Sequence, residues 1–198
     1  MTTRATKAKP PSEGSVDRVA AARAIDAFLS AIGRDPTAEP DLVGTGERVV
    51  DAFVDDLCAG YTVDTRARIL EATIDAGASS IVVVRDIPVV TTCPHHLLPA
   101  IGTAAVAMKT RSKLAGLGAI AALVDAHARR LALQENIGER VLDDLEAALA
   151  PEWAACKLVL AHGCMIARGE RATGSRVETL AIRGVDTASA LAAIGEGR

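Results

Sequence analysis

The stretch TTCPHHLLPA, residues 91–100, holds the densest set of side chains that could do chemistry. It places the thiol of Cys93 and the imidazoles of His95 and His96 within four positions, in a chain that has only four cysteines and four histidines. Thiolate sulfur and imidazole nitrogen are ligands that zinc prefers. The Cys93-x-x-His96 spacing therefore indicates two ligands of a metal site.

A second stretch, LAHGCMIARG at residues 160–169, carries a histidine, a thiol and a guanidinium. The pattern of residues 153–168 predicts one long strand, and side chains two positions apart on a strand share a face. On a regular strand, His162, Cys164 and Arg168 would therefore point the same way. Such a face would be unusual for a core but suits the wall of a site that handles an anion.

Cys164 is the candidate for a third metal ligand beside Cys93 and His96. Three protein ligands leave one position of a zinc tetrahedron for water, which is the arrangement of a catalytic site. A structural site would normally need a fourth ligand. Cys58 and Cys156 are available, but their apolar contexts predict buried thiols instead.

Other interpretations of these residues stay open at this point. Cys93 could be a nucleophile activated by His95 or His96. That hypothesis leaves His162 and Cys164 without a role. Cys164 could also be a buried apolar thiol and His162 a hydrogen-bonded core histidine. The H-x-E and P-C-x-x-C signature of zinc nucleobase deaminases is absent from the sequence.

The elements that must position these residues follow a helix-first order. Apolar spacing predicts a helix over 16–32, with Ser15 as its N-cap and Gly33 as its stop. Further helices are predicted over 47–60, 117–131 and 137–149, and strands over 79–90, 102–110, 153–168 and 176–184. Helices followed by strands that flank a helical pair indicate an α+β fold with an antiparallel sheet.

Composition excludes several classes of function. The net charge of −3 gives no general attraction to nucleic acid or to an anionic membrane, and 2% aromatic residues supply no stacking platform for bases. No window approaches the roughly 18 continuous apolar residues of a membrane span. Residues 1–14 are polar and basic without the apolar segment of a secretory signal. We therefore expect a flexible N-terminal tail and a cytoplasmic protein.

Taken together, the two clusters resemble motifs of the GTP cyclohydrolase I family. That family carries a C-E-H-H-L/F segment, a V-Q-E-R segment at the end of a helix, and an H-x-C-M/V-x-x-R-G segment. The corresponding residues here are 93–99, 133–136 and 162–169, and weaker matches lie at 45–50 and 84–87. Order and approximate spacing agree over about residues 22–185.

The resemblance implies a tunnelling fold, in which a four-stranded antiparallel sheet with two inserted helices follows N-terminal helices. On this basis we expect a helical segment over 15–60 and a catalytic domain over 61–198. The resemblance also implies a homo-oligomer, a decamer of two pentameric rings with active sites between subunits. It implies Zn²⁺ bound by Cys93, His96 and Cys164.

The activity implied by the resemblance is hydrolytic opening of the imidazole ring of GTP, giving formate and 7,8-dihydroneopterin triphosphate. His95 and His162 flank the expected metal ligands and are the candidates for proton transfer. Glu135 would accept two hydrogen bonds from the guanine edge, and Gln134 beside it is a second candidate for substrate binding. Arg168 would contribute to substrate binding.

The sequence departs from the family pattern at four positions. Gly118, Ala119 and Ala122 stand where the family has a Ser-Lys pair and an Arg that hold the triphosphate, and Pro94 replaces a Glu. Other cations could compensate from a neighbouring subunit, namely Arg66, Arg68, Lys109, Arg111 and Lys113. The departures leave two alternatives open: a related cyclohydrolase for another nucleotide or nucleoside, or a non-catalytic binding or scaffold protein with this fold.

Overall fold

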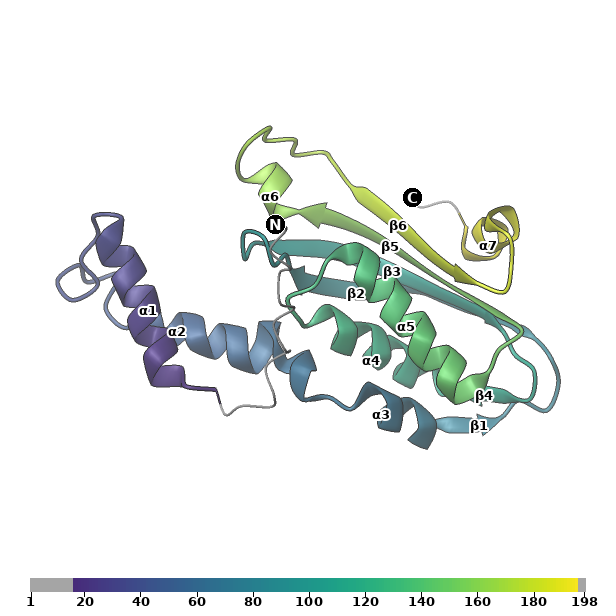
Figure 1. Ribbon diagram of the computed structural model, residues 1–198. Helices are drawn as coiled ribbons and strands as arrows, with labels where there is room; N and C mark the ends of the chain where they lie inside the picture. Colours follow the sequence, from purple (N-terminus) through teal and green to yellow (C-terminus); the bar gives the residue numbers. More distant parts are fainter. Residues whose placement is uncertain (1–15, 196–198) are drawn as a thin grey trace, which may run out of the picture. The chain divides into compact units, whose positions relative to one another are not determined.

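The computed structural model describes residues 16–195 (Figure 1). The tail expected over residues 1–14 and the N-cap expected at Ser15 lie outside the described residues. By its internal contacts the chain divides into two compact units, Met1–Val54 and Asp55–Arg198.

The first unit is a pair of helices, α1 (Arg18–Ala31) and α2 (Thr45–Asp51). Asp17 caps α1, because its carboxylate accepts a hydrogen bond from the backbone N–H of Ala20 at 2.9 Å. The two helices approach closely at Gly46, whose N–H donates to the Asp26 carboxylate at 3.2 Å. A side chain on Gly46 would meet the carbonyl oxygen of Ala22 at 2.5 Å, so only glycine fits there.

The connection between the units stays helical, as predicted for residues 47–60, but its hydrogen-bond pattern changes. A π-helical turn, η1 (Ala52–Leu57), follows α2, and a 3₁₀ turn, η2 (Ala59–Thr62), comes after it. Helix α3 (Thr65–Glu71) then begins the second unit's helical layer, with Asp64 capping the N–H of Ala67.

The second unit is built on an antiparallel sheet in the order β2-β3-β5-β6. Its strands are β2 (Ile81–Thr92), β3 (Pro99–Lys109), β5 (Trp153–His162) and β6 (Val177–Arg183). In the second half of β2, burial alternates along the strand, as expected for a sheet that buries one face. Ile87 and Val89 are buried, whereas Pro88 and Val90 are exposed. The expectation of an α+β fold with an antiparallel sheet is confirmed.

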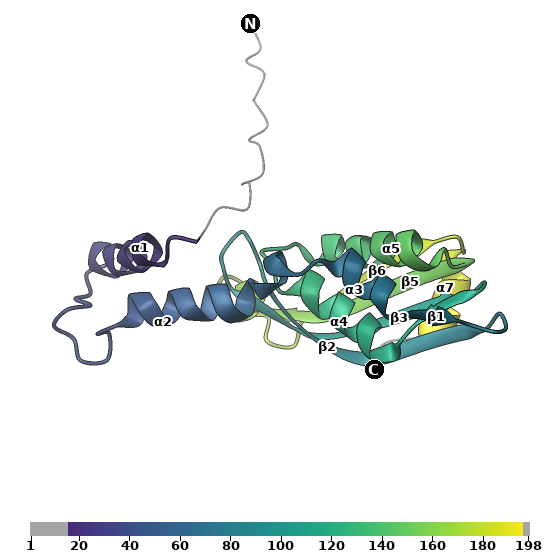
Figure 2. The same cartoon turned by 90° about the horizontal axis from the view of Figure 1, so that it is seen from below.

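Two inserted helices, α4 (Leu117–Ala128) and α5 (Gln134–Leu149), lie side by side along the sheet (Figures 1 and 2). Their apolar faces and the sheet form the main core, which includes Ile120, Val124, Ile137, Leu145 and Leu158. Two short strands, β1 (Thr73–Asp75) and β4 (Lys113–Ala115), pair into a small second sheet that the sequence pattern did not predict.

A C-terminal helix, α7 (Thr187–Ile194), was also not predicted, and it packs with Trp153 and Ala155 in a second apolar cluster. A bulge in β2 aims Arg85 at the end of this helix. There the guanidinium donates to the carbonyl oxygens of Ala193 at 2.7 Å and Ile194 at 3.0 Å. Those carbonyls would otherwise lack partners at the helix terminus.

The predicted strand over 153–168 is wrong beyond His162. Residues Gly163–Ile166 form a helical turn, α6. The reason lies in the neighbouring strand: His162 pairs with Ala100, and β3 begins at Pro99, so no strand remains for later residues to pair with. Gly163 also sits where a side chain would meet the Pro99 carbonyl oxygen at 2.8 Å.

One buried carboxylate links three helices of the second unit. Asp144 on α5 accepts a hydrogen bond from the Thr65 hydroxyl at 2.6 Å and lies 2.9 Å from Nε2 of His127 on α4. Arg66 approaches the same carboxylate at 3.6 Å. His127 is only 4% exposed, and its Nδ1 has no hydrogen-bond partner among residues 16–195. The ring is therefore best accommodated neutral, with Nε2–H donating to Asp144.

We expect His127 to make the protein less stable in mild acid. Burial lowers the pKa of His127 from 6.5, and the hydrogen bond with Asp144 opposes that shift. The unfolded chain therefore binds the proton first as the pH falls. Above the unfolded-state pKa this residue contributes no pH dependence. Below it the free energy of unfolding should decrease by up to about 1.4 kcal/mol per pH unit, until the lower folded-state pKa is passed.

Denaturant unfolding followed between about pH 8 and pH 5 measures this effect. In His127→Leu, which cannot titrate at this position, that part of the slope should disappear. An identical pH dependence in the wild type and the variant would contradict the prediction.

Candidate metal centre and its pocket

The loop between β2 and β3 presents the first two candidate ligands. Its turn is closed by two backbone hydrogen bonds, from Cys93 N–H to the Leu98 carbonyl at 3.0 Å and from Leu97 N–H to the Cys93 carbonyl at 2.9 Å. Leu97 adopts a left-handed conformation with φ of 53°. Pro94 has no N–H group. It is tolerated in this loop because neither of the bonds that close the turn needs a donor at position 94.

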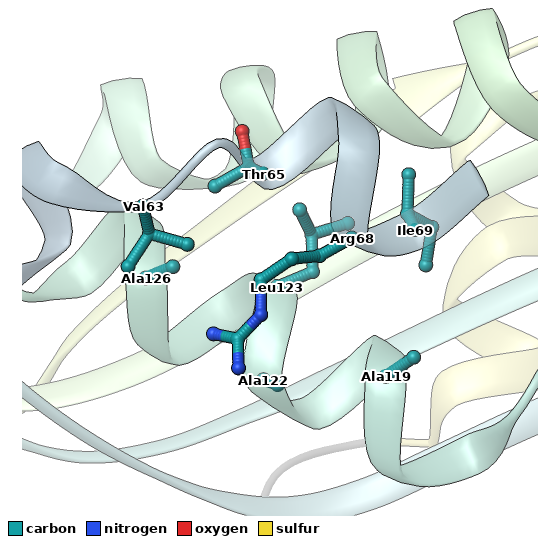
Figure 3. A pocket seen from close by; sticks show the side chains of 8 residues that line it. All are labelled: Val63, Thr65, Arg68, Ile69, Ala119, Ala122, Leu123 and Ala126. Carbon is teal, nitrogen blue, oxygen red and sulfur yellow. The ribbon is translucent and has the colours of Figure 1, made fainter. Parts of the chain in front are cut away.

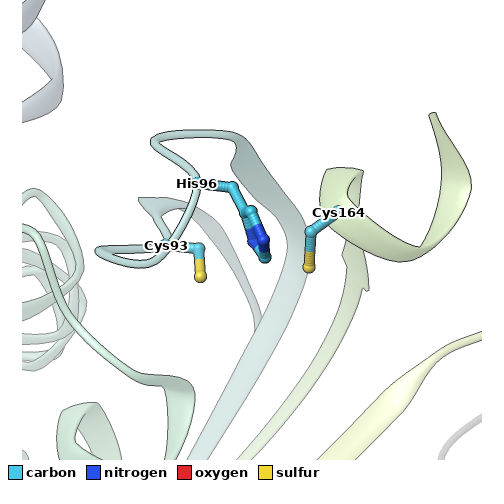
Figure 4. Close-up of side chains that lie close together, drawn as sticks. All are labelled: Cys93, His96 and Cys164. Carbon is cyan, nitrogen blue, oxygen red and sulfur yellow. The ribbon is translucent and has the colours of Figure 1, made fainter. Parts of the chain in front are cut away.

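Cys164 reaches the same place from α6, immediately after β5 ends. The candidate ligand atoms of Cys93, His96 and Cys164 all lie within 4.8 Å of one another (Figure 4). Cys93 is buried, Cys164 is half-buried and His96 is exposed. Within residues 16–195 this group could hold a metal ion, and two thiols with one imidazole form a donor set that suits zinc.

The way Cys164 is presented differs from the expectation. Because α6 interrupts the strand, His162, Cys164 and Arg168 do not share one strand face. His162 is the last residue of β5, whereas Cys164 belongs to the helical turn. The turn is what brings the second thiol to the β2–β3 loop (Figure 4).

A pocket of about 170 Å³ adjoins the cysteines. Its lining includes the four residues that the sequence analysis proposed for proton transfer or substrate binding, namely His95, Gln134, Glu135 and His162. Gln134 and Glu135 begin α5, three residues before the predicted start of that helix. Glu135 is exposed, so its carboxylate is free to meet a ligand.

Arg168 does not line this pocket but lies at the exposed side of the metal group. Its Nη1 donates a hydrogen bond to Nε2 of His96 at 3.2 Å. A guanidinium only donates hydrogen bonds, so Nε2 of His96 accepts this one. The positive charge of Arg168 therefore stands beside the candidate metal ligands.

The other two cysteines do not join the group. Cys156 is 0% exposed in the middle of β5, and burial raises the pKa of its thiol to about 12. Burial also raises the pKa of Cys58, which is half-buried. Both thiols are thus poor nucleophiles and poor metal ligands at neutral pH.

The helix face that lacks the expected cations forms part of a different pocket, also of about 170 Å³. Ala119 and Ala122 lie on its α4 side, and Thr65 and Arg68 on its α3 side (Figure 3). The Arg68 side chain extends from α3 toward Ala122. Of the other compensating candidates, Arg66 is near Asp144, and Lys109 pairs with Glu152 at 2.8 Å.

These features define a class. The protein is an α+β protein with an antiparallel sheet. At one end of the sheet, a loop and a helical turn bring together a Cys-His-Cys group that is able to hold a metal. This group lies next to a pocket with histidine and carboxylate side chains. None of the helices within residues 16–195 has the length and apolar character needed to cross a membrane.

The chain belongs to the GTP cyclohydrolase I family. The model of that family, described as GTP cyclohydrolase I, matches residues 21–192. The family resemblance is thereby confirmed, and with it the tunnelling fold and the assignment to a family of hydrolases.

Individual relatives agree over most of their lengths. GTP cyclohydrolase 1 of Leifsonia xyli subsp. xyli is 36% identical over 169 residues, which cover 85% of this chain and 87% of the relative. GTP cyclohydrolase 1 of Synechococcus sp. strain JA-3-3Ab is 37% identical over 177 residues, covering 89% and 76%. GTP cyclohydrolase 1 of Streptomyces avermitilis is 36% identical over 173 residues, covering 86% and 85%.

Proposed function

We propose that this protein is a zinc-dependent GTP cyclohydrolase I, which converts GTP and water into formate and 7,8-dihydroneopterin triphosphate. The observation that carries the proposal is the placement of Cys93, His96 and Cys164 within 4.8 Å of one another, in a chain of this family. Zinc bound by these residues would supply Lewis acidity that makes water nucleophilic at neutral pH.

The pocket residues have distinct parts in this proposal. Glu135 accepts two hydrogen bonds from N–H groups of the guanine edge, which fixes the orientation of the base. His95 and His162 hold and release the protons that ring opening requires, because an imidazole nitrogen can both accept and donate a proton. Gln134 lines the same pocket and supports the site beside Glu135.

The triphosphate needs cations, and the guanidinium of Arg168 stands beside the metal group, 3.2 Å from His96. Charge-assisted hydrogen bonds to phosphate are among the strongest that a side chain makes. Since α4 offers Ala119 and Ala122 instead of cations, the proposal gives Arg168 a large share of the binding energy for the phosphate tail.

We also propose that the protein acts as a homo-oligomer, a decamer of two pentameric rings, with a helical segment over 15–60 preceding the catalytic domain over 61–198. Apart from a single bridge between Thr92 and Leu131, the outer strands β2 and β6 each have a neighbouring strand on one side only within the described chain, which leaves edges for strands of other copies. Native mass spectrometry measures the subunit number. A cytoplasmic location would keep the free thiols reduced.

Incubation of the zinc-loaded protein with GTP tests the function. Formate and a dihydropterin chromophore should appear in equal amounts. A protein with full metal content that releases neither product from GTP would rule the proposal out.

Arg168→Ala should raise the KM for GTP by about 10- to 100-fold, because it removes a charge-assisted contact to phosphate. Turnover of guanosine, which has no phosphate, should not change between the wild type and the variant. Arg176→Ala is the matched control, since Arg176 lies in the same connection between α6 and β6 and its guanidinium contacts the carbonyl oxygen of Ser175. If Arg168→Ala instead loses metal, Arg168 serves His96 and not the substrate.

A further inference from the structure

Gln134 is the first residue of α5, and its side chain is held by protein groups on both sides of its amide. It is only 2% exposed. Its Nε2 lies within hydrogen-bond distance of three oxygen atoms, namely the carbonyls of Leu158 at 3.2 Å and Val177 at 3.0 Å and the hydroxyl of Thr179 at 3.2 Å. Its Oε1 lies 2.7 Å from Nε2 of His162.

These partners fix which way the amide faces. A carbonyl oxygen only accepts hydrogen bonds, so the NH₂ group of Gln134 must face Leu158 and Val177. The oxygen of the amide then faces His162, and Nε2 of His162 must be the donor. This leaves Nδ1 as the ring nitrogen of His162 that is free to meet a ligand.

The contact also links three elements around the pocket. Leu158 and His162 belong to β5, Val177 and Thr179 to β6, and Gln134 starts α5. The amide therefore ties the first turn of the helix to the end of the sheet from which His162 projects. With both ends of its amide engaged and only 2% of the residue exposed, the Gln134 side chain is poorly placed to offer a hydrogen bond to a guanine base.

We propose that Gln134 is a positioning residue that holds the ring of His162, and that it does not bind the base. This inference rests on the proposed function, because it specifies how one pocket histidine is presented for that reaction. Glu135, the next residue on α5, is exposed and takes the base. Of these two adjacent residues, Gln134 thus orients a proton-transfer group and Glu135 recognises the substrate.

The test compares two variants of the zinc-loaded full chain. Gln134→Met removes the contact to His162 at similar volume, whereas Thr179→Val removes a contact of the same amide and leaves His162 untouched. For Gln134→Met we expect kcat with GTP to fall by roughly 10- to 100-fold, the range typical of residues that orient groups in a metal site. The KM for GTP and the metal content should stay as in the wild type, and Thr179→Val should keep kcat.

A second measurement does not depend on activity. Nitrogen-15 spectra of protein labelled at its four histidines report which ring nitrogen carries hydrogen. His162, assigned through a His162→Gln variant, should show hydrogen on Nε2 in the wild type and a mixture of both forms in Gln134→Met. An unchanged His162 spectrum in the folded Gln134→Met variant would overturn the inference.

The outcomes separate this inference from the proposed function. A raised KM with normal kcat in Gln134→Met would mean that Gln134 binds the base, and the inference would be wrong while the function stands. If the wild-type protein does not turn over GTP, the proposed function is wrong. The spectra would still show whether Gln134 holds the ring of His162.

Discussion

Cys164→Ala is expected to abolish activity together with metal binding. The substitution leaves Cys93 and His96 as a two-ligand pair, which holds zinc weakly. Without the metal the pKa of the attacking water rises far above neutral pH, so kcat should fall by at least roughly 10³-fold. Metal analysis by mass spectrometry and GTP turnover on the same preparation measure both effects.

Cys58→Ala is the matched control, because Cys58 is also half-buried but lies outside the group. It should keep full metal content and activity. A Cys164→Ala protein that retains stoichiometric zinc would show that the ligand set is different. One that loses zinc but still converts GTP would show that the metal is not catalytic.

Glu135→Gln should reduce kcat/KM for GTP by about 10³-fold or more. The carboxylate can accept two hydrogen bonds from the guanine edge, whereas an amide accepts one and turns a donor toward the other N–H group. One hydrogen bond to a charged group, worth about 1.5–3 kcal/mol, is lost, the other loses its charge assistance, and two donors are set against each other, which together account for an effect of this size. Steady-state kinetics with GTP measure it.

The control for Glu135→Gln is Glu146→Gln, the same change at an exposed position further along α5. It should leave kcat/KM unaltered. Equal losses in the two variants would point to a general effect of charge on the helix, and an unaffected Glu135→Gln would remove Glu135 from the site.

Much of the fold could be predicted from periodicity. Apolar spacing identified α1, α4 and α5, and a β-branched run identified β2, because burial against one core imposes both patterns. The short elements β1 and β4 escaped prediction, since three-residue strands carry no measurable period. Helix α3 was missed for a similar reason, as only Ile69 of its seven residues is buried.

The error at the end of β5 has a different origin. The sequence after His162 is compatible with a strand, but whether it becomes one depends on a partner. The partner strand β3 begins only at Pro99, so it has no residue that could pair beyond His162. The position of that boundary is set by the β2–β3 loop and not by residues 163–168. Pairing between distant segments decides such boundaries, and a local pattern does not contain it.

For the candidate site, residue types and spacing indicated the Cys93, His96 and Cys164 set, and the family motifs directed attention to Gln134 and Glu135. The hydrogen bond between Gln134 and His162 could not be predicted, because it joins residues of two elements through side chains. Their roles in binding and proton transfer stay predictions until the variants are measured.

The order of synthesis has a consequence for how the centre matures. Cys93 and His96 are synthesised well before Cys164, so the growing chain at first has only two of the three candidate metal ligands. The last thiol arrives through the same pairing, Ala100 with His162, that joins the two halves of the sheet. An ion that binds afterwards would cross-link two halves of the sheet that are already paired. Removing it with a chelator should therefore lower the stability of this end of the sheet without preventing the sheet from forming.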